Sequence, residues 1–504
     1  MFLVAAVEPW LVAWLTPLWL IAAGLALGLG VLLLAWGCLF VVARPLAKEI
    51  PSIIGEGVLF PLLVIVALLS IFGVVGAFFA PNPQGMLESV VRLPFGGTRP
   101  LVTAIIPAGT DVEENEAVRH PVEVGFRGDE LKQMDIRSNE MVLVSDGATE
   151  EEAISPPVEI NPIDGFQWKR QSSVGTPFEG EFVKRFYVMN LSPNDAEVTF
   201  EITTGPAFPE AKIIPLTALC VIAVFGLYVV QAVFFPKVSA IALATTKSEL
   251  AQPLFQIILI LGIFLILLFV VLPYNTFGED IKMFKITGLT SIMILSIVQG
   301  VWAASNSISD EVDGRTALTV MSKPISRAQF IMGKFSGILW TVMLMFVVLG
   351  VWLLIWVAYK PIYDAREMGA EVPTWDYTLA EVVKTVPGIV LAFLEVIVMV
   401  AISVAISTRL PMMANFAICF TIYLLGHLIP LIAMSDVQFA PVVFIGQLIA
   451  TVLPVLDHFN IQAAVAQGAV VPWSYIGVST LLCLLYSGIA MLLALILFED
   501  RDLA

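Results

Sequence analysis

Residues Ser307 to Gly337 read SISDEVDGRTALTVMSKPISRAQFIMGKFSG, a charged and polar stretch between two long apolar segments. Acidic residues come early in it, at Glu311 and Asp313, and basic residues follow. This order suits a short helix, because each type of charge then lies near the favourable end of the helix dipole. Lys323-Pro324 interrupts that helix, since proline disfavours helical geometry in the residue before it. The stretch therefore predicts a helix, a break at the proline, and a second helix.

The second helix is predicted to begin beside Ser326. Ser326 fits an N-cap, and Gln329, three residues later, fits its capping-box partner. From Arg327 the helix runs directly into an apolar span, in which Gly333 and Gly337 form a small-xxx-small face. Such a face allows another helix to approach closely. On spacing alone, a solvated loop between two membrane helices remains the simpler interpretation.

The motifs of this stretch resemble the cytoplasmic loop of type-2 ABC transporter permeases. Their order is E-x-x-G-R-T, then L-x-x-x-S-K-P-I-S-R, then F-x-x-G-K-x-x-G. In that family the loop carries the coupling helix that docks on the ATPase subunit. The resemblance therefore implies a coupling loop at 304–337. The expected docking residues are Glu311, Asp313, Arg315, Lys323, Pro324 and Arg327, and Gly333 and Gly337 are expected to pack against another helix.

The composition is that of an integral membrane protein. Of the 504 residues, 58% are hydrophobic and 13% are charged, whereas soluble proteins carry about a quarter charged residues. The four cysteines all fall in apolar spans, which favours packing over disulfides or metal binding. The sequence has no zinc-protease motif and no P-loop. We therefore expect no catalytic residue, metal or cofactor in this chain. The family resemblance implies that a partner ATPase binds ATP and Mg²⁺.

The apolar runs predict about nine transmembrane helices in a 3 + 6 pattern, with a β-sandwich domain inserted between the second and third. Each run is about as long as the ~20 residues that cross a bilayer. The predicted spans are 18–42, 58–80, 213–235, 254–272, 286–303, 338–357, 389–407, 412–432 and 475–498.

Residues 81–212 contain no apolar run long enough to span a membrane, and their residue pattern differs from that of the spans. They hold 22 Asp and Glu against 11 Lys and Arg, a balance of −11 within the total of −16. This acidity argues against nucleic-acid binding. Alternating runs predict half-buried strands, and the best predicted hairpin joins 182–189 to 196–203 through a turn rich in Asn, Ser, Pro and Asp. We expect an extracytoplasmic β-sandwich of immunoglobulin-like type.

The order of elements after this domain follows the plan of the resembled family. The predicted organisation is an N-terminal membrane segment at 1–80 with two spans, the third span at 213–235, and a six-span permease core at 236–504. The core would begin with an interfacial elbow at Pro236–Pro253. Whether Val442–Leu453 spans the membrane or forms a re-entrant segment stays open, because it is short for a span.

The distribution of basic residues predicts the orientation. Placing the coupling loop in the cytoplasm puts ten Lys and Arg on inside segments, against five on short outside loops. Those five are Lys282, Lys285, Lys360, Arg366 and Lys384. The positive-inside rule then favours a multi-pass protein of the cell (inner) membrane. Its N-terminus and β-domain would be extracytoplasmic and its C-terminus cytoplasmic.

Two polar residues in the predicted spans are candidates for a transport path. Glu395 lies in mid-span, where a carboxylate costs at least about 2.5 kcal/mol on insertion scales. It would either line the path or be a protonated or hydrogen-bonded packing residue. His427 lies in the next span, beside Pro430. A lone histidine on an apolar helix is more often a hydrogen-bonded packing residue than a ligand, so both interpretations remain open.

The resemblance implies a membrane-spanning permease subunit of an ATP-driven transporter, most often an exporter, and no enzymatic activity of its own. Its partners would be an ABC ATPase, a second permease subunit in a homo- or heterodimer, and the lipid bilayer. The β-domain would contact an extracytoplasmic partner, or gate or receive substrate. The alternative is a non-transporting membrane scaffold that presents the β-domain. An intramembrane enzyme has little support, because the spans hold no Ser/His, paired-Asp or zinc constellation.

Overall fold

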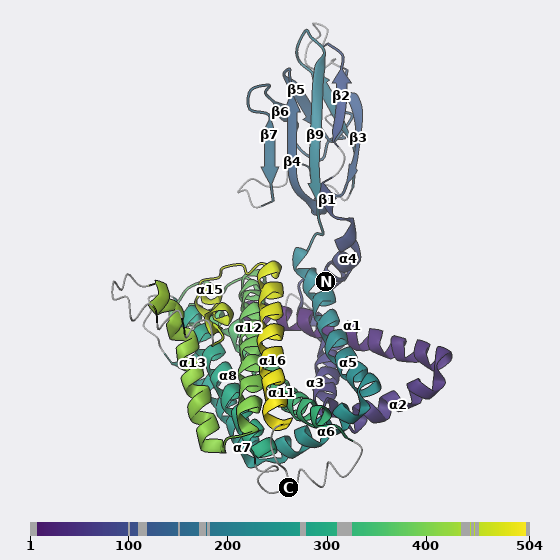
Figure 1. Ribbon diagram of the computed structural model, residues 1–504. Helices are drawn as coiled ribbons and strands as arrows, with labels where there is room; N and C mark the ends of the chain where they lie inside the picture. The colour runs from purple at the N-terminus through teal and green to yellow at the C-terminus, as the bar shows by residue number, and fades with distance from the viewer. Residues whose placement is uncertain are drawn as a thin grey trace. The chain divides into compact units, whose positions relative to one another are not determined.

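A computed structural model describes residues 8–98, 101–108, 118–149, 152–170, 178, 182–272, 279–309, 325–434, 444, 448 and 453–499. The chain forms two compact units. The helical unit consists of Met1–Pro81 with Leu216–Ala504, and the β unit is Asn82–Pro215. Figure 1 shows the helices of the first unit and the strands of the second.

Helices build the helical unit, and most of them are long and apolar. They are α1 (Pro9–Val42), α2 (Arg44–Gly55), α3 (Phe60–Val75), α5 (Ile213–Phe234), α6 (Pro236–Ala251), α7 (Pro253–Val271), α8 (Asp280–Ala304), α11 (Arg327–Glu367), α12 (Trp375–Ser407), α13 (Met412–Met434), α15 (Gln462–Ala466) and α16 (Trp473–Glu499). Within the described residues, eight helical segments are long and apolar enough to cross a bilayer. The protein is therefore a polytopic helical membrane protein with a β-rich region.

The predicted spans coincide with helices. Eight of them match the eight long segments, and the remaining one, 412–432, lies in α13, whose described apolar part Met412–Leu428 is shorter. The number of nine spans stays a prediction. The structure also lengthens several spans beyond their apolar runs: α8 starts at Asp280 and α11 continues to Glu367.

This lengthening corrects the placement of two basic residues. Lys285 and Lys360, predicted in short outside loops, are buried inside α8 and α11. Both are paired with carboxylates, Lys285 with Glu381 and Lys360 with Asp364. A helix can extend through charged positions when each charge finds an opposite one, and a hydropathy pattern does not include such pairs.

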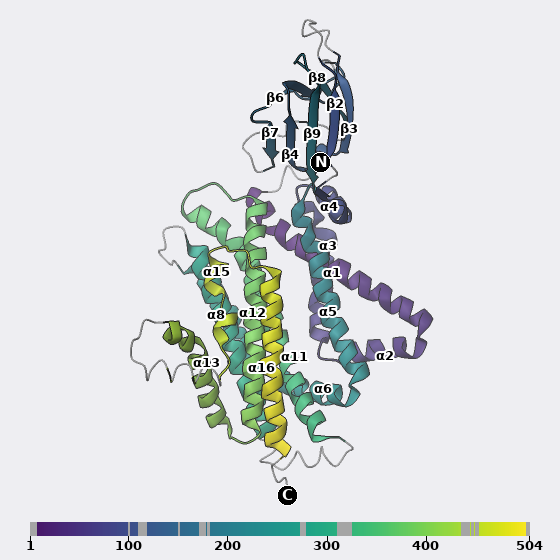
Figure 2. The same cartoon turned by 45° about the horizontal axis from the view of Figure 1, so that its top comes forward.

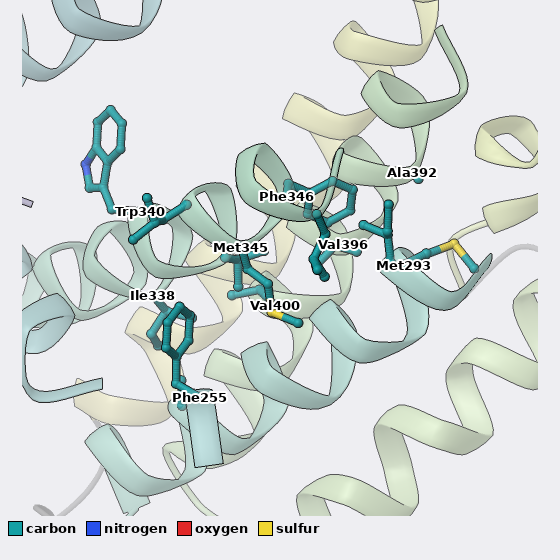
Figure 3. Close-up of a cluster of buried hydrophobic side chains, with 14 of the residues drawn as sticks. Phe255, Met293, Ile338, Trp340, Met345, Phe346, Ala392, Val396 and Val400 are labelled. Atoms are coloured by element: carbon teal, nitrogen blue, oxygen red, sulfur yellow. The ribbon is translucent and has the colours of Figure 1, made fainter. Parts of the chain in front are cut away.

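The helices α11 and α12 form the centre of the unit. In the most apolar 18-residue stretch of α12, 67% of the residues are buried, whereas in the corresponding stretch of α1 only 6% are buried. Met345 and Phe346 of α11 pack with Val396 and Val400 of α12 in one hydrophobic cluster (Figure 3). Figure 2 shows α16 lying along α12, which it contacts extensively. The two central helices thus connect most of the other spans.

The first span packs against this centre. Trp14 of α1 donates its indole N–H to the Ile355 carbonyl of α11 at 3.2 Å. Thr378 of α12 donates its hydroxyl to the Ala13 carbonyl at 2.6 Å. The N-terminal segment therefore packs directly on α11 and α12, a contact that the sequence did not predict.

The β unit is a sandwich of two antiparallel sheets. One sheet contains β1 (Gly97–Thr98), β2 (Val102–Ile106), β4 (Leu131–Ser138), β7 (Phe166–Lys169) and β9 (Ala196–Thr204). The other contains β3 (His120–Phe126), β5 (Val142–Ser145), β6 (Val158–Ile160) and β8 (Val183–Asn190). The inward side chains of both sheets share one hydrophobic core that includes Phe126, Phe186 and Phe200.

The predicted hairpin is wrong. Its two strands exist as β8 and β9, but β8 pairs with β3 and β5, whereas β9 pairs with β1, β2 and β4. The connection between them crosses from one sheet to the other, and the Asn190 side chain donates to the Asn194 carbonyl at 2.7 Å within it. Alternation specifies which face of a strand is buried, but it does not specify the strand beside it.

Candidate functional site

The structure describes only the two ends of the predicted coupling loop, residues 304–309 and 325–337. Glu311, Asp313, Arg315, Lys323 and Pro324 lie outside the described residues. Before them, α8 ends at Ala304 and continues as a single π-helical turn at Ser305–Ser309. After them, α11 begins at Arg327. Single π-turns in α-helices are frequent at functional sites.

The predicted capping box at the start of α11 is confirmed. The Ser326 hydroxyl accepts from the Gln329 backbone N–H at 3.2 Å, and the Ser326 N–H donates to the Gln329 side chain at 3.1 Å. Each bond satisfies a donor that has no partner within the helix. The loop therefore has two anchors. The first anchor is the π-helical turn at Ser305–Ser309 before the loop, and the second is this capped start of α11 after it.

Arg327 makes contacts that the sequence did not predict. Its guanidinium donates to the carbonyl oxygens of Phe498 and Glu499, at 3.3 and 2.5 Å. Arg409 donates to the neighbouring Leu497 carbonyl at 2.8 Å. Two cations thus satisfy the last carbonyls of α16, where the helix dipole favours positive charge. Arg327 ties the start of α11 to the end of α16.

We expect Arg327→Ala to lower the stability of the protein. Removing a charged hydrogen bond to exposed carbonyls costs about 1 kcal/mol, so the melting temperature in detergent should fall, and Arg327→Lys should restore part of it. If Arg327→Ala left the melting temperature unchanged but abolished ATPase binding, the docking role predicted for Arg327 would be favoured over the role at α16.

Gly333 and Gly337 lie where α11 approaches α6. A Cβ atom at Gly333 would lie 2.6 Å from the Ile241 Cβ. A Cβ atom at Gly337 would lie 2.7 Å from the Ala242 carbonyl oxygen. Thr246 of α6 donates its hydroxyl to the Gly337 carbonyl at 2.8 Å. The two backbones are therefore close enough that only glycine fits at these two positions.

A cavity of about 740 Å³ lies between α6 and both ends of the loop. Ser307 and Ile325, one from each end of the loop, line it. Charged side chains of both signs also line it, namely Lys237, Glu249 and Lys334. The interfacial elbow predicted from the sequence and the two loop anchors thus line one cavity that carries charged groups.

A buried polar cluster connects the first anchor to two further spans. The Asn415 amide nitrogen of α13 lies 2.8 Å from the hydroxyls of Ser305, Ser403 and Ser407. Cys419 donates to the Asn415 carbonyl oxygen at 3.2 Å. An amide has two N–H donors, so it serves two of the three serines at a time. The π-helical turn after α8 is thereby joined to α12 and α13, through small polar residues that the sequence analysis did not single out.

Glu395 and His427, named separately from the sequence, lie together in the structure. The Glu395 carboxylate is fully buried, and its Oε1 lies 3.4 Å from the His427 Nε2. The side chain of His427 is 19% exposed. The pair joins α12 to α13 inside the predicted six-span core.

Two further buried charge pairs were missed by the sequence analysis. Lys285 of α8 bonds Glu381 of α12, which also pairs with Lys384 at 3.3 Å. On α11, Lys360 bonds Asp364 at 2.7 Å and the Val270 carbonyl at 3.2 Å. The spacing of Lys360 and Asp364, four residues apart, could have indicated the second pair. The first joins residues 96 apart, and no local pattern indicates it.

Among the described residues, no cluster of three or more His, Cys, Asp and Glu is arranged to hold a metal ion.

Comparison with known protein families gives a match for the C-terminal part of the chain. Residues 265–503 match the model of the family described as ABC-2 family transporter protein. The match contains α8, α11 and the loop between them, and it begins after α6 and within α7. No curated protein matches the chain. Through residues 265–503 the chain is similar to the ABC-2 family transporter proteins, and this match confirms the resemblance seen in the loop motif.

Proposed function

We propose that this chain is the membrane-spanning subunit of an ATP-driven exporter. A separate ABC ATPase would bind ATP and Mg²⁺ and dock on the loop at 304–337, through Glu311, Asp313, Arg315, Lys323, Pro324 and Arg327. A second permease subunit, identical or related, would complete the assembly. The observation that carries the proposal is the family match over a segment that contains this loop and both of its anchors.

The contacts of the two anchors support a mechanical role for the loop. Its first anchor continues α8 and is bonded through Asn415 to α12 and α13. Its second anchor starts α11, which packs on α6 at Gly337 and is held to α16 by Arg327. A displacement of the loop would therefore move α8 and α11 and reach four neighbouring helices, α6, α12, α13 and α16, through direct contacts.

The proposed transport cycle is alternating access. Closure of the ATPases would push the loop, and α8 and α11 would pass this movement to the cavity between two six-span cores. Glu395 and His427 are the proposed polar residues of the transport path. In this scheme the loop and the C-terminus are cytoplasmic, and the β unit is extracytoplasmic, where it would contact a partner or gate or receive substrate. The charge bias of the short loops supports this orientation.

Charge reversal in the loop tests the proposal. We expect Glu311→Arg with Arg315→Glu to reduce the amount of ABC ATPase that co-purifies with the tagged chain at least tenfold, because reversed charges meet like charges on the partner. The ATPase is quantified by mass spectrometry of the purified membrane complex. A matched control is Glu123→Arg with Arg185→Glu, which reverses an exposed ion pair of 3.0 Å in the β unit.

The outcomes separate the two candidate functions. Loss of the ATPase in the loop variant but not in the control supports the transporter. Equal ATPase recovery in all three proteins, or none even in the unaltered chain, contradicts the docking proposal and favours the scaffold. Labelling of a cysteine at Lys323 by a membrane-impermeant reagent in intact cells would place the loop outside and also contradict the proposal.

A further inference from the structure

Glu395 is a buried carboxyl group with no hydrogen bond to any described residue. Its side chain is 0% exposed. Neither of its oxygens has a hydrogen-bond partner in the described part of the chain. An ionised carboxylate in such a place loses its hydration without replacement, which costs several kcal/mol. The charge state of Glu395 therefore depends on the group that lies nearest to it.

That group is His427, and its hydrogen bonding determines which nitrogen faces Glu395. The His427 Nδ1 lies 3.0 Å from the Tyr423 carbonyl oxygen. A carbonyl oxygen only accepts, so Nδ1 carries the hydrogen. In the neutral imidazole, Nε2 is then a bare acceptor, and it lies 3.4 Å from Glu395 Oε1. Two acceptors facing each other at this distance repel, so one proton must lie between them.

The surroundings determine where this proton resides. Apolar side chains packed around this part of α12 include Leu391, Leu394, Leu456 and Phe459. Asp457 is a further charged group near Glu395. Further titratable groups in or beside the same cluster are Tyr423 and Cys419 on α13, His458 after α13, and Tyr475, Cys483 and Tyr486 on α16. None of these is a fixed cation, so a neutral pair is favoured over a desolvated ion pair.

We propose that Glu395 and His427 form a proton-binding site inside the membrane core, in which Glu395 holds the proton as a neutral carboxylic acid and His427 exchanges it with the exterior. Glu395 is fully enclosed, which excludes a ligand larger than a proton at its carboxyl group. His427 is partly exposed and therefore accessible to an external proton acceptor.

Exchange at this site moves one proton and no electrons. The O–H bond of Glu395 breaks as an N–H bond forms at His427 Nε2, and the resulting imidazolium releases a proton to water. The carboxylate left behind is charged in an apolar environment, so the deprotonated state favours separation of α12 and α13 and entry of water. Proton occupancy thereby biases the packing of the two helices.

Infrared spectroscopy of the purified full-length protein in lipid nanodiscs tests the site directly. At neutral pH the unaltered protein should show the carbonyl stretch of one protonated carboxylic acid that Glu395→Gln lacks. His427→Gln should shift this band, because the acceptor of the acid changes. Glu371→Gln, which removes an exposed carboxylate, is the matched control and should leave the band unchanged.

The stability of the same proteins gives a second measurement. Raising the pH should lower the melting temperature of the unaltered protein as Glu395 loses its proton, and Glu395→Gln should reduce this dependence. An acid band that persists in Glu395→Gln overturns the proposal, as does an imidazolium signal from His427 beside an ionised Glu395. No measurement here involves the ATPase, so this inference can fail while the proposed function stands, and the reverse also holds.

Discussion

Gly337→Ala is expected to destabilise the helical unit, although alanine is the better helix former. In an open helix the substitution gains up to about 1 kcal/mol. At Gly337 the new methyl group would lie 2.7 Å from the Ala242 carbonyl oxygen and 2.7 Å from the Thr245 Cβ. Neither atom can rotate away, so α6 must separate from α11. Such overpacking costs about 1–3 kcal/mol, and thermal unfolding in detergent should show a clear fall in melting temperature.

Gly350→Ala is the matched control on the same helix. A Cβ atom at Gly350 would lie 3.5 Å from the nearest atom, in ordinary van der Waals contact with Ile389. This variant should therefore be as stable as the unaltered protein or slightly more stable. Equal melting temperatures for Gly337→Ala and Gly350→Ala would show that α6 does not lie against α11 as the structure has it. Gly337→Leu should enlarge the loss and also reduce ATPase recovery, because α6 borders the loop anchors.

Glu381→Ala is expected to have the largest effect on stability. Its partner Lys285 is fully buried, and removing the carboxylate leaves an ammonium group without compensation among apolar helices. Breaking a buried ion pair by deleting one member costs about 3–5 kcal/mol. Folded yield after membrane extraction and the midpoint of denaturant unfolding should both fall.

Variants at Lys285, Glu381 and Lys384 should lose stability in a definite order. Lys285→Met should cost less than Glu381→Ala, because Glu381 keeps Lys384 at 3.3 Å. Lys384→Met should cost least, since its side chain is 33% exposed. The double variant Lys285→Met with Glu381→Leu should recover most of the loss, because well-packed apolar side chains can replace a buried ion pair. A double variant as unstable as Glu381→Ala would contradict this explanation.

Local patterns predicted the elements of the helical unit well. The length of each apolar run is enough to predict a span, and the capping box at Ser326 depends only on residues three apart. The loop motif that indicated the family likewise depends only on residues close together in the sequence. For the loop itself, five of the six proposed docking residues lie outside the described part of the chain, so their role stays a prediction.

Contacts between distant residues were not predictable in this way. The hairpin prediction failed because alternation in 183–190 and 196–204 fits a strand in either sheet. The contact of Arg327 with the end of α16 was not predicted, because the two segments lie far apart in the sequence. In both cases the local sequence defined the element correctly and gave no information about its neighbour.

The sequence by itself determined that this chain is a membrane protein with an acidic β-rich insertion, a charged loop between apolar spans and a family motif in that loop. Burial of apolar surface drives these features, and burial is non-directional, so a run of hydrophobic residues specifies a span but not its neighbour. The tertiary structure decided that Glu395 faces His427, that Lys285 bonds Glu381, and that α1 packs on the core. Those pairings depend on complementary shape and on hydrogen bonds between residues far apart in the chain, which form only once the helices are packed.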